Sequence, residues 1–256
     1  MNEHQFELLR GASFIGALVL ALLLQRFRPH ARLRDSWALN GGLWFTNVIV
    51  LGLVCGACAC TVARWAASHG IGLLNTVAAP TWFGVLITIV ALDLTSYVWH
   101  RANHRVPFLW RFHQVHHSDP NFTVSTGVRF HPGELLLSFP LRLTAVALLG
   151  ASAEAVVLFE AVFTVANLVE HGDIDLPARF ERLVGHTFVT PALHRRHHTK
   201  VRPHRDTNFG TILSIWDRLL GTRADNDSAT AVETGLPGVG ALSLFRAYLL
   251  PLRRAA

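Results

Sequence analysis

Charged residues are scarce in this chain. Asp, Glu, Lys and Arg make up 16% of the sequence and hydrophobic residues 51%, whereas a soluble domain usually carries about 25% charged residues. The deficit extends over most of the chain, so the composition excludes an ordinary soluble domain and predicts a polytopic membrane protein. A chain of 256 residues accommodates one integral membrane domain and leaves no room for an added reductase domain of normal size.

Cysteine is scarce as well, and its spacing excludes two kinds of site. Cys55, Cys58 and Cys60 are the only cysteines and lie in one apolar run. A zinc ribbon or an iron–sulfur cluster would need a second pair of ligands besides the single C-x-x-C. We therefore interpret these cysteines as small apolar residues of a membrane helix. The sequence also lacks a nucleotide-binding glycine motif, so it contains no evident route for electrons from a nicotinamide cofactor.

The net charge of +6 does not point to nucleic acid. The arginines flank apolar runs, which is typical of residues at the cytoplasmic face of a membrane. Four of them, Arg26, Arg28, Arg32 and Arg34, follow the first apolar run. This pattern predicts an extracytoplasmic N-terminus. The first eleven residues are acidic and lack a basic segment before the apolar run, so we expect a retained helix in place of a signal peptide.

The apolar runs are long enough for membrane helices, which need about 20 residues. We expect such helices over 6–24, 43–63 and 82–99, and a hairpin over 135–149 and 153–169 that penetrates the membrane completely or partly. The predicted fold is an all-α polytopic helical bundle with a cytosolic, histidine-rich helical cap. Its parts are N-terminal membrane helices (1–81), a catalytic domain (82–222) and a tail with an amphipathic helix (223–256). Counting spans places the histidines and the C-terminus in the cytoplasm, and we expect the bacterial inner membrane.

Histidine is abundant, with 15 residues, and it is clustered. The clusters are one H-x-x-x-H and two H-x-x-H-H motifs, formed by His100 and His104, by His113, His116 and His117, and by His194, His197 and His198. A single histidine pair is usually structural. Eight imidazoles at one membrane face are different, because protonated they would repel one another and buried they would lack partners. Metal binding solves both problems, and eight ligands require two ions.

Two stripes of polar residues lead into this cluster at helical spacing. Asp93 and Tyr97 precede His100 and His104 on one helix face, and an acid inside a membrane run is a candidate for a functional residue. We expect Asp93 to accept a hydrogen bond from a ligand histidine. Packing against a neighbouring helix is the alternative.

The second stripe runs from Glu160 through Thr164 and Asn167 to His171. An apolar helix that ends in histidine at this face predicts His171 as a ninth ligand. Asn167 would hold a metal-bound water or bond to another helix.

Other residues near the motifs have weaker patterns. His131, in "VRFHPGE", lies at a boundary set by Pro132, and a structural hydrogen bond is favoured over metal binding. Asp217 would bond a ligand imidazole or pair with an arginine such as Arg218. No E-x-x-H pattern occurs in the histidine motifs, so the site differs from that of the soluble di-iron bundles.

These motifs, taken together, resemble those of the fatty acid hydroxylase/sterol desaturase superfamily of membrane di-iron enzymes. The resemblance covers about 82–222 through "DLTSYVWHRANH", "LWRFHQVHHS", "RFHP", "TPALHRRHHT" and "NFGTILSIWDRLLGT". It implies an α-helical membrane fold, two iron ions at a cytoplasmic site and O2-dependent oxidation of lipid C–H bonds. By this resemblance the eight motif histidines are iron ligands, and His171 matches an extra histidine between the second and third motifs. Zinc would substitute for iron in isolated protein.

The resulting hypothesis is a lipid hydroxylase, with a desaturase that uses the same site as the alternative. A membrane metal transporter is a different class, and it would need ligands along a path through the membrane. We expect a lipid substrate and a separate electron donor, a ferredoxin or cytochrome b5. Eight basic residues would form its docking surface or contact lipid headgroups: Arg101, Arg105, Arg111, Arg195, Arg196, Lys200, Arg202 and Arg205.

Overall fold

The computed structural model describes residues 3–54, 59–224 and 233–253, and these residues form helices and isolated β-bridges but no β-strand. The predicted all-α fold is confirmed. Five long helices make up most of the bundle: α1 (Glu3–Phe27), α2 (Trp37–Val54), α5 (Thr81–Arg105), α7 (Pro132–Leu149) and α8 (Ala153–Glu170). The shorter elements are α3 (Ala59–Ser68), α4 (Leu73–Thr76), α6 (Pro107–His117), η1 (Val124–Val128), α9 (Ala178–Gly185), α10 (Pro191–His197), α11 (Arg202–Arg205), α12 (Ile215–Leu219), α13 (Leu244–Leu249) and η2 (Leu250–Leu252).

Among the described residues, four stretches are long and apolar enough to cross a membrane: Gln5–Phe27, Trp37–Thr76, Thr81–Arg105 and Pro132–Leu149. Large apolar side chains on these helices face outward, among them Ile15, Phe45 and Trp82. A soluble protein rarely exposes so much apolar surface, so these are the features of a membrane helical bundle. The expected helix over 43–63 is described as two helices, α2 and α3. Cys55 and Cys58 lie outside the described residues, and Cys60 is a buried free thiol.

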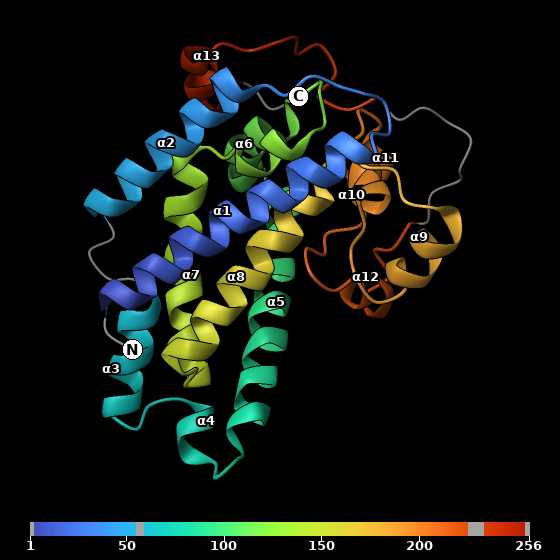
Figure 1. Ribbon diagram of the computed structural model, residues 1–256. Coiled ribbons are helices and arrows are strands. Elements are labelled where there is room, and N and C mark those ends of the chain that lie inside the picture. The colour runs from blue at the N-terminus through green and yellow to red at the C-terminus, as the bar shows by residue number, and fades with distance from the viewer. Residues whose placement is uncertain (1–2, 55–58, 225–232, 254–256) are drawn as a thin grey trace.

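The bundle brings the ends of α1 and α8 together at one end of the molecule. Helix α1 runs along α8, and the short helices α6, α10 and α11 gather near the ends of α1 and α8 (Figure 1). The segment after α1 is fixed there, since the backbone N–H of Leu33 donates to Asp173 at 2.9 Å. At the start of α2, the N–H of Ser36 donates to Ser125 at 3.1 Å. The basic segment 26–34 and the histidines therefore share one end of the bundle. The compartment that this end faces stays a prediction.

Three proline residues begin the helices around the histidines. Pro107, Pro132 and Pro191 each occupy the first turn of a helix, α6, α7 and α10. The residue before a proline disfavours helical backbone, and Val106 is extended between α5 and α6. The chain therefore turns between the H-x-x-x-H motif on α5 and the first H-x-x-H-H motif on α6, and both motifs face one centre.

The far end of the bundle is closed by a tight backbone contact. Gly72 precedes α4 and Gly150 ends α7, both with positive φ, and a Cβ on Gly72 would lie 2.2 Å from the backbone nitrogen of Gly150. Only glycine fits there. At the histidine end, Ala247 of α13 packs with Leu43 of α2 and Val115 of α6. Phe245 on the same short helix is 70% exposed, and its contact with a membrane surface stays a prediction.

Candidate metal centre

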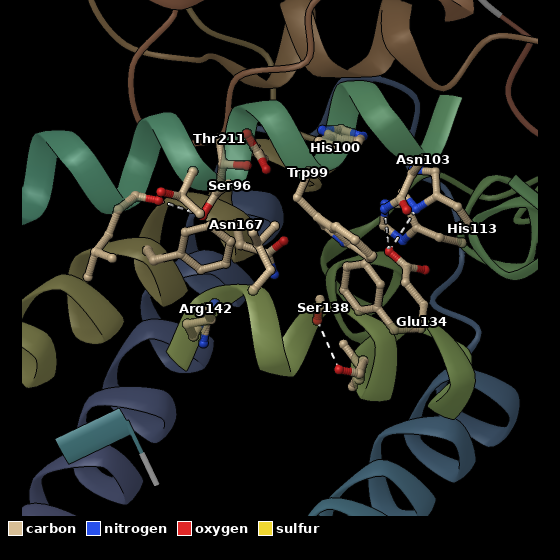
Figure 2. A pocket seen from close by; sticks show the side chains of 18 of the residues that line it. Ser96, Trp99, His100, Asn103, His113, Glu134, Ser138, Arg142, Asn167 and Thr211 are labelled. Atoms are coloured by element: carbon tan, nitrogen blue, oxygen red, sulfur yellow. Dashed lines mark hydrogen bonds and ion pairs between the residues drawn. The ribbon is translucent and has the colours of Figure 1, made fainter. Parts of the chain in front are cut away.

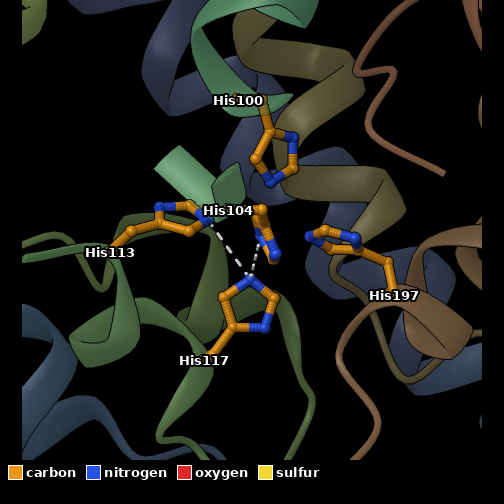
Figure 3. Close-up of side chains that lie close together, drawn as sticks. All are labelled: His100, His104, His113, His117 and His197. Carbon is orange, nitrogen blue, oxygen red and sulfur yellow. Dashed lines mark hydrogen bonds between the residues drawn. The ribbon is translucent and has the colours of Figure 1, made fainter. Parts of the chain in front are cut away.

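Nine histidines meet in two groups, and they are the nine that the sequence predicts as ligands. The five-histidine group contains His100, His104, His113, His117 and His197, whose rings converge in Figure 3. The four-histidine group contains His116, His171, His194 and His198. Within each group, one nitrogen of every ring lies within 4.8 Å of the others. Metal binding by these residues stays a prediction, and the geometry below tests whether they suit it.

Each H-x-x-H-H motif is divided between the two groups. On α6, His113 and His117 enter the five-histidine group while His116 enters the other. The second motif reverses this order, because His194 and His198 enter the four-histidine group and His197 the five-histidine group. Helix geometry explains the division. Residues four apart differ by about 40° around the axis, whereas adjacent residues differ by about 100°. The repeated motif therefore places two rings on one side and one on the other.

Most rings are oriented by a hydrogen bond that Nδ1 donates. In the five-histidine group, the acceptors are Phe209 O for His100 (2.9 Å), Thr207 O for His197 (2.7 Å), Glu134 for His113 (2.9 Å) and Asp206 for His104 (3.3 Å). In the four-histidine group, they are Arg129 O for His116 (3.3 Å) and Asn167 O for His171 (2.6 Å). A carbonyl oxygen only accepts, so the proton lies on Nδ1 and the lone pair on Nε2.

The Nε2 atoms of several rings face one another, and in His116 and His171 both of these atoms carry the lone pair. Nε2 of His171 lies 3.0 Å from Nε2 of His116 and 3.0 Å from Nε2 of His194. In the other group, Nε2 of His117 lies 3.1 Å from that of His104 and 3.2 Å from that of His113. Two nitrogens bound to one ion at about 2.1 Å are about 3.0 to 3.4 Å apart. Facing lone pairs at this distance repel without a cation between them, so the arrangement suits a metal ion in each group.

Unpartnered nitrogens support the same conclusion. Nε2 of His100 and of His197 is buried without a hydrogen bond among the described residues, and so are both nitrogens of His198. Burial without a partner is costly for a polar atom. A metal ion in each group would provide these nitrogens with the missing partner.

Burial also keeps the rings neutral. It lowers the pKa of His197 to about 3 and that of His171 to about 4. For His198, burial and then the neighbouring His116 and His194 hold the pKa well below its usual value. Because a metal binds the neutral imidazole, the site is ready to bind a cation near neutral pH.

One pocket reaches both groups. It lies between α5, α7 and α8, and its wall includes His100 and His113 from one group and His116, His171 and His194 from the other. Figure 2 shows Asn103, His113 and Glu134 at one end and Arg142 toward the other. The remaining wall is largely apolar, with Trp99, Leu135, Phe159 and Phe163 among its residues. The pocket therefore suits an apolar molecule with one end at the histidines.

The two aspartates of the predicted site bind the backbone and no histidine. Asp93 accepts from the N–H groups of Ile212 and Leu213 (3.2 and 3.1 Å) and from the Trp216 indole (2.8 Å). Asp93 was expected to accept a hydrogen bond from a ligand histidine. Its three hydrogen bonds instead connect α5 to the loop after α11 and to Trp216. Its buried carboxylate needs several donors, and the free N–H groups of that loop supply them.

Asp217 has a similar role in place of the expected bond to an imidazole. It accepts from the N–H groups of Phe209 and Gly210 at 2.7 and 2.9 Å and from the Thr222 hydroxyl at 2.7 Å. Tyr97 is bonded to the same Thr222 at 2.7 Å. Because Phe209 O accepts a hydrogen bond from His100, Asp217 positions the His100 ring indirectly through the backbone.

Asn167 and His131 have structural partners. The Asn167 amide donates to Gly127 O at 2.7 Å, which is the expected bond to another element, while its backbone carbonyl orients His171. His131 begins α7, where its Nδ1 accepts from the N–H of Gly133 at 2.9 Å, and its Nε2 donates to Tyr248 O at 3.3 Å. It lies outside both histidine groups.

Sequence reasoning missed two buried acids. Glu134 accepts from His113 and, at 3.1 Å, from the Asn103 amide. Glu170 lies next to the four-histidine group and has no hydrogen-bond partner in the described part of the chain, and burial raises the pKa of its carboxyl well above the usual value. The signal was present in both cases: Glu134 lies in the first turn of an apolar helix beside "RFHP", and Glu170 immediately precedes His171.

The predicted basic docking surface is smaller than the sequence indicates. Arg195 is buried and donates to Ile174 O at 2.9 Å. Arg205 is buried too, with its guanidinium 4.6 Å from the centre of the Trp110 ring. Both side chains pack inside the cap and cannot contact a partner. Arg105, Arg111 and Arg202 remain exposed.

Comparison with known proteins finds one matching family model and several similar proteins. The family model described as "Fatty acid hydroxylase" matches residues 85–222. The chain is 33% identical to ornithine lipid hydroxylase OlsE of Rhizobium tropici over 68% of this chain and 52% of the relative. It is 28% identical to human cholesterol 25-hydroxylase over 54% of this chain and 50% of the relative. Alkylglycerol monooxygenase of Danio rerio is 26% identical over 82% of this chain and 46% of the relative.

The chain therefore spans about half the length of the curated relatives that it matches. No solved structure matches it.

Proposed function

Because the chain belongs to the fatty acid hydroxylase family, we propose that it is a membrane-bound di-iron oxygenase that hydroxylates a C–H bond of a lipid with O2 and externally supplied electrons. The observation that carries the proposal is the pocket that reaches both histidine groups. The facing nitrogens of each group suit one ion, and the pocket wall joins them to an apolar space.

Two iron ions held by the nine histidines would supply the oxidising power for the C–H bond. The chain itself does the remaining work. Glu134 and the backbone carbonyls keep the proton on Nδ1 of the rings, so that Nε2 stays available for a metal. Burial of the rings excludes water from the place of reaction.

The substrate would enter with its chain along the apolar wall between α7 and α8. Leu135, Phe163 and Trp99 line this path. A lipid suits such a wall, and the relatives are named for hydroxylation of an ornithine lipid, cholesterol and an alkylglycerol. Those names favour hydroxylation over desaturation. The names give three different lipids, so we propose a lipid as the substrate class.

Electrons would arrive from a separate acidic carrier, a ferredoxin or cytochrome b5. Exposed Arg202 lies 3.7 Å from Asp206, and Asp206 accepts the Nδ1 proton of His104. This short path links a basic surface to the five-histidine group. Segment 26–34 is rich in arginine, and arginines near membrane helices favour the cytoplasmic side. Because this segment lies at the histidine end, we propose that this end faces the cytoplasm of a bacterial inner membrane.

Lipid mass spectrometry of cells with and without the protein tests the activity. The expected result is a lipid species that carries one additional oxygen atom only in cells that contain the active protein. A species that has lost two hydrogen atoms instead would indicate the desaturase. The control is the same chain with His197→Ala, expressed to the same level, and an unchanged lipid profile in all cells would contradict the proposal.

Metal analysis of the purified protein tests the centre independently. We expect about two ions per chain, with iron in the active form and zinc replacing it in part, since zinc binds nitrogen ligands more tightly than ferrous iron. Reductant and lipid should cause oxygen uptake by the iron form alone. Less than one ion per folded, unchelated chain would refute a two-ion centre.

A further inference from the structure

The carboxyl group of Glu170 stands out among the buried acids. Glu170 ends α8 and is 1% exposed, and neither of its oxygens has a hydrogen bond among the described residues. Asp93 and Asp217 each accept three hydrogen bonds, and Glu134 accepts two through one oxygen. A buried carboxylate is costly unless it is paired with a cation or with donors. Among the described residues, no side chain forms a hydrogen bond with the Glu170 carboxyl, and two histidine nitrogens lie 3.8 Å from it.

The four-histidine group lies beside this carboxyl. Glu170 Oε1 is 3.8 Å from Nε2 of His194, and that nitrogen is 3.0 Å from Nε2 of His171. The other neighbour, Nδ1 of His171 at 3.8 Å, already donates to Asn167 O. The carboxyl thus stands at the edge of the group, next to nitrogens whose lone pairs need a cation.

Charge balance differs between the two groups. In the five-histidine group, Glu134 and Asp206 each accept a hydrogen bond from a ring Nδ1–H. In the four-histidine group, the acceptors identified for the rings are neutral backbone carbonyls. Neutral imidazoles cannot compensate a divalent cation, and Glu170 is the carboxylate in contact range of this group. It would also raise the number of protein donors there from four to five.

We propose that Glu170 is the anionic ligand of the ion in the four-histidine group. The inference rests on the proposed function, because it assumes that this group holds an ion. The carboxyl turns toward His194 to bind, which its flexible side chain permits, and the cation removes the cost of its burial. The two ions then differ in kind, one bound by five imidazoles and the other by four imidazoles and a carboxylate.

Glu170→Gln tests the inference in the full-length protein in detergent or nanodiscs. The substitution keeps the volume and removes the charge. Metal content and competition with a chelator should show one ion bound as in the wild type and the other bound about tenfold more weakly or lost. With ⁵⁷Fe, the Mössbauer signal of one iron should change while the other stays the same.

Glu160→Gln is the matched control on the same helix. Glu160 lies about 15 Å along α8 from Glu170 and pairs with Arg10 at 2.9 Å. Its substitution should leave metal content and both Mössbauer signals unchanged. If Glu170→Gln also bound two ions with wild-type affinity and unchanged signals, the inference would be wrong while the proposed di-metal function stood. If the wild type itself held less than one ion, the proposed function would fail first.

A second measurement avoids dependence on the folding of the variant. The infrared difference spectrum between apo and metal-loaded wild type should contain the bands of a carboxylate that binds the metal. Labelling glutamate with ¹³C should shift these bands. A difference spectrum without a shifted glutamate band would overturn the inference.

Discussion

The two histidine groups are built from the same motifs but are supported differently. In the five-histidine group, two carboxylates hold rings, Glu134 on His113 and Asp206 on His104, and Asp206 is 26% exposed at the surface of the cap. In the four-histidine group, backbone carbonyls hold His116 and His171, and the nearby acid, Glu170, makes no hydrogen bond to any residue that the structure describes. A repeated motif thus fixes how many rings enter each histidine group and in which direction they point. The acids around each group make the two groups different.

Removing one ligand from each group should have the largest effect. We expect His197→Ala, in the five-histidine group, and His116→Ala, in the four-histidine group, to abolish activity, because both ions are needed. Each variant should keep about one ion per chain, and the remaining Mössbauer signal should differ between the two. The control is His30→Ala, an exposed histidine that belongs to neither group, with unchanged activity and metal content. Full turnover of either ligand variant would show that the two groups do not form one centre.

Glu134→Gln should have the next largest effect, and only in the five-histidine group. The amide that replaces the carboxylate weakens the orientation and basicity of His113. Loss of such a partner typically lowers metal affinity or activity about 10- to 100-fold. Competition with a chelator measures the affinity of each ion separately. Equal weakening of both ions would mean that the groups are not independent.

Asp206→Asn should weaken the same group less. The bond from His104 to Asp206 is 3.3 Å, longer than the 2.9 Å bond from His113 to Glu134. Partial exposure of Asp206 lets water replace part of the interaction. We expect a loss of metal affinity of at most about tenfold, measured in the same competition assay. An effect larger than that of Glu134→Gln would reverse the order that burial predicts.

Charge reversal on the cap should give the smallest effect and leave the metals in place. In a variant with Arg105→Glu, Arg111→Glu and Arg202→Glu, the KM for an acidic ferredoxin should rise several-fold. Raising the ionic strength should reduce the difference from the wild type, because salt screens exposed charges. Steady-state oxygen uptake at varied ferredoxin concentration measures it. An unchanged KM would assign these arginines to lipid headgroups instead.

Much of this architecture can be predicted from the sequence, because it depends on the spacing of residues that lie close together in the chain. The helical fold, the membrane character and the resemblance to the family are confirmed. All nine predicted histidines meet because positions three and four apart share a helix face and because Pro107 turns α6 against α5. The motifs carry the direction of their own rings within a few residues, and the packing of α8 and α10 near α5 and α6 brings the segments together.

Long-range partners were not readable in the same way. Asp93 was expected to bond a histidine, yet its donors come from residues 212, 213 and 216. The carbonyl acceptors of His100 and His197 lie in the loop that Asp217 shapes, and backbone groups leave no mark in a sequence. Glu134 and Glu170 were missed because neither belongs to a histidine motif or to one of the two polar stripes. Arg195 and Arg205 looked exposed because charge alone does not reveal burial.

The division of the motifs also sets an order in which the centre is completed during protein synthesis. His100, His104, His113 and His117 emerge from the ribosome within one short segment, while His116 is then alone in its group. His197 and His198 follow about 80 residues later, which at about 5 to 20 residues per second takes several seconds. During that interval a nascent chain would present four of the five proposed ligands of one ion and at first only His116 of the other. The five-histidine position is therefore the one exposed longest to whichever metal the cell supplies first.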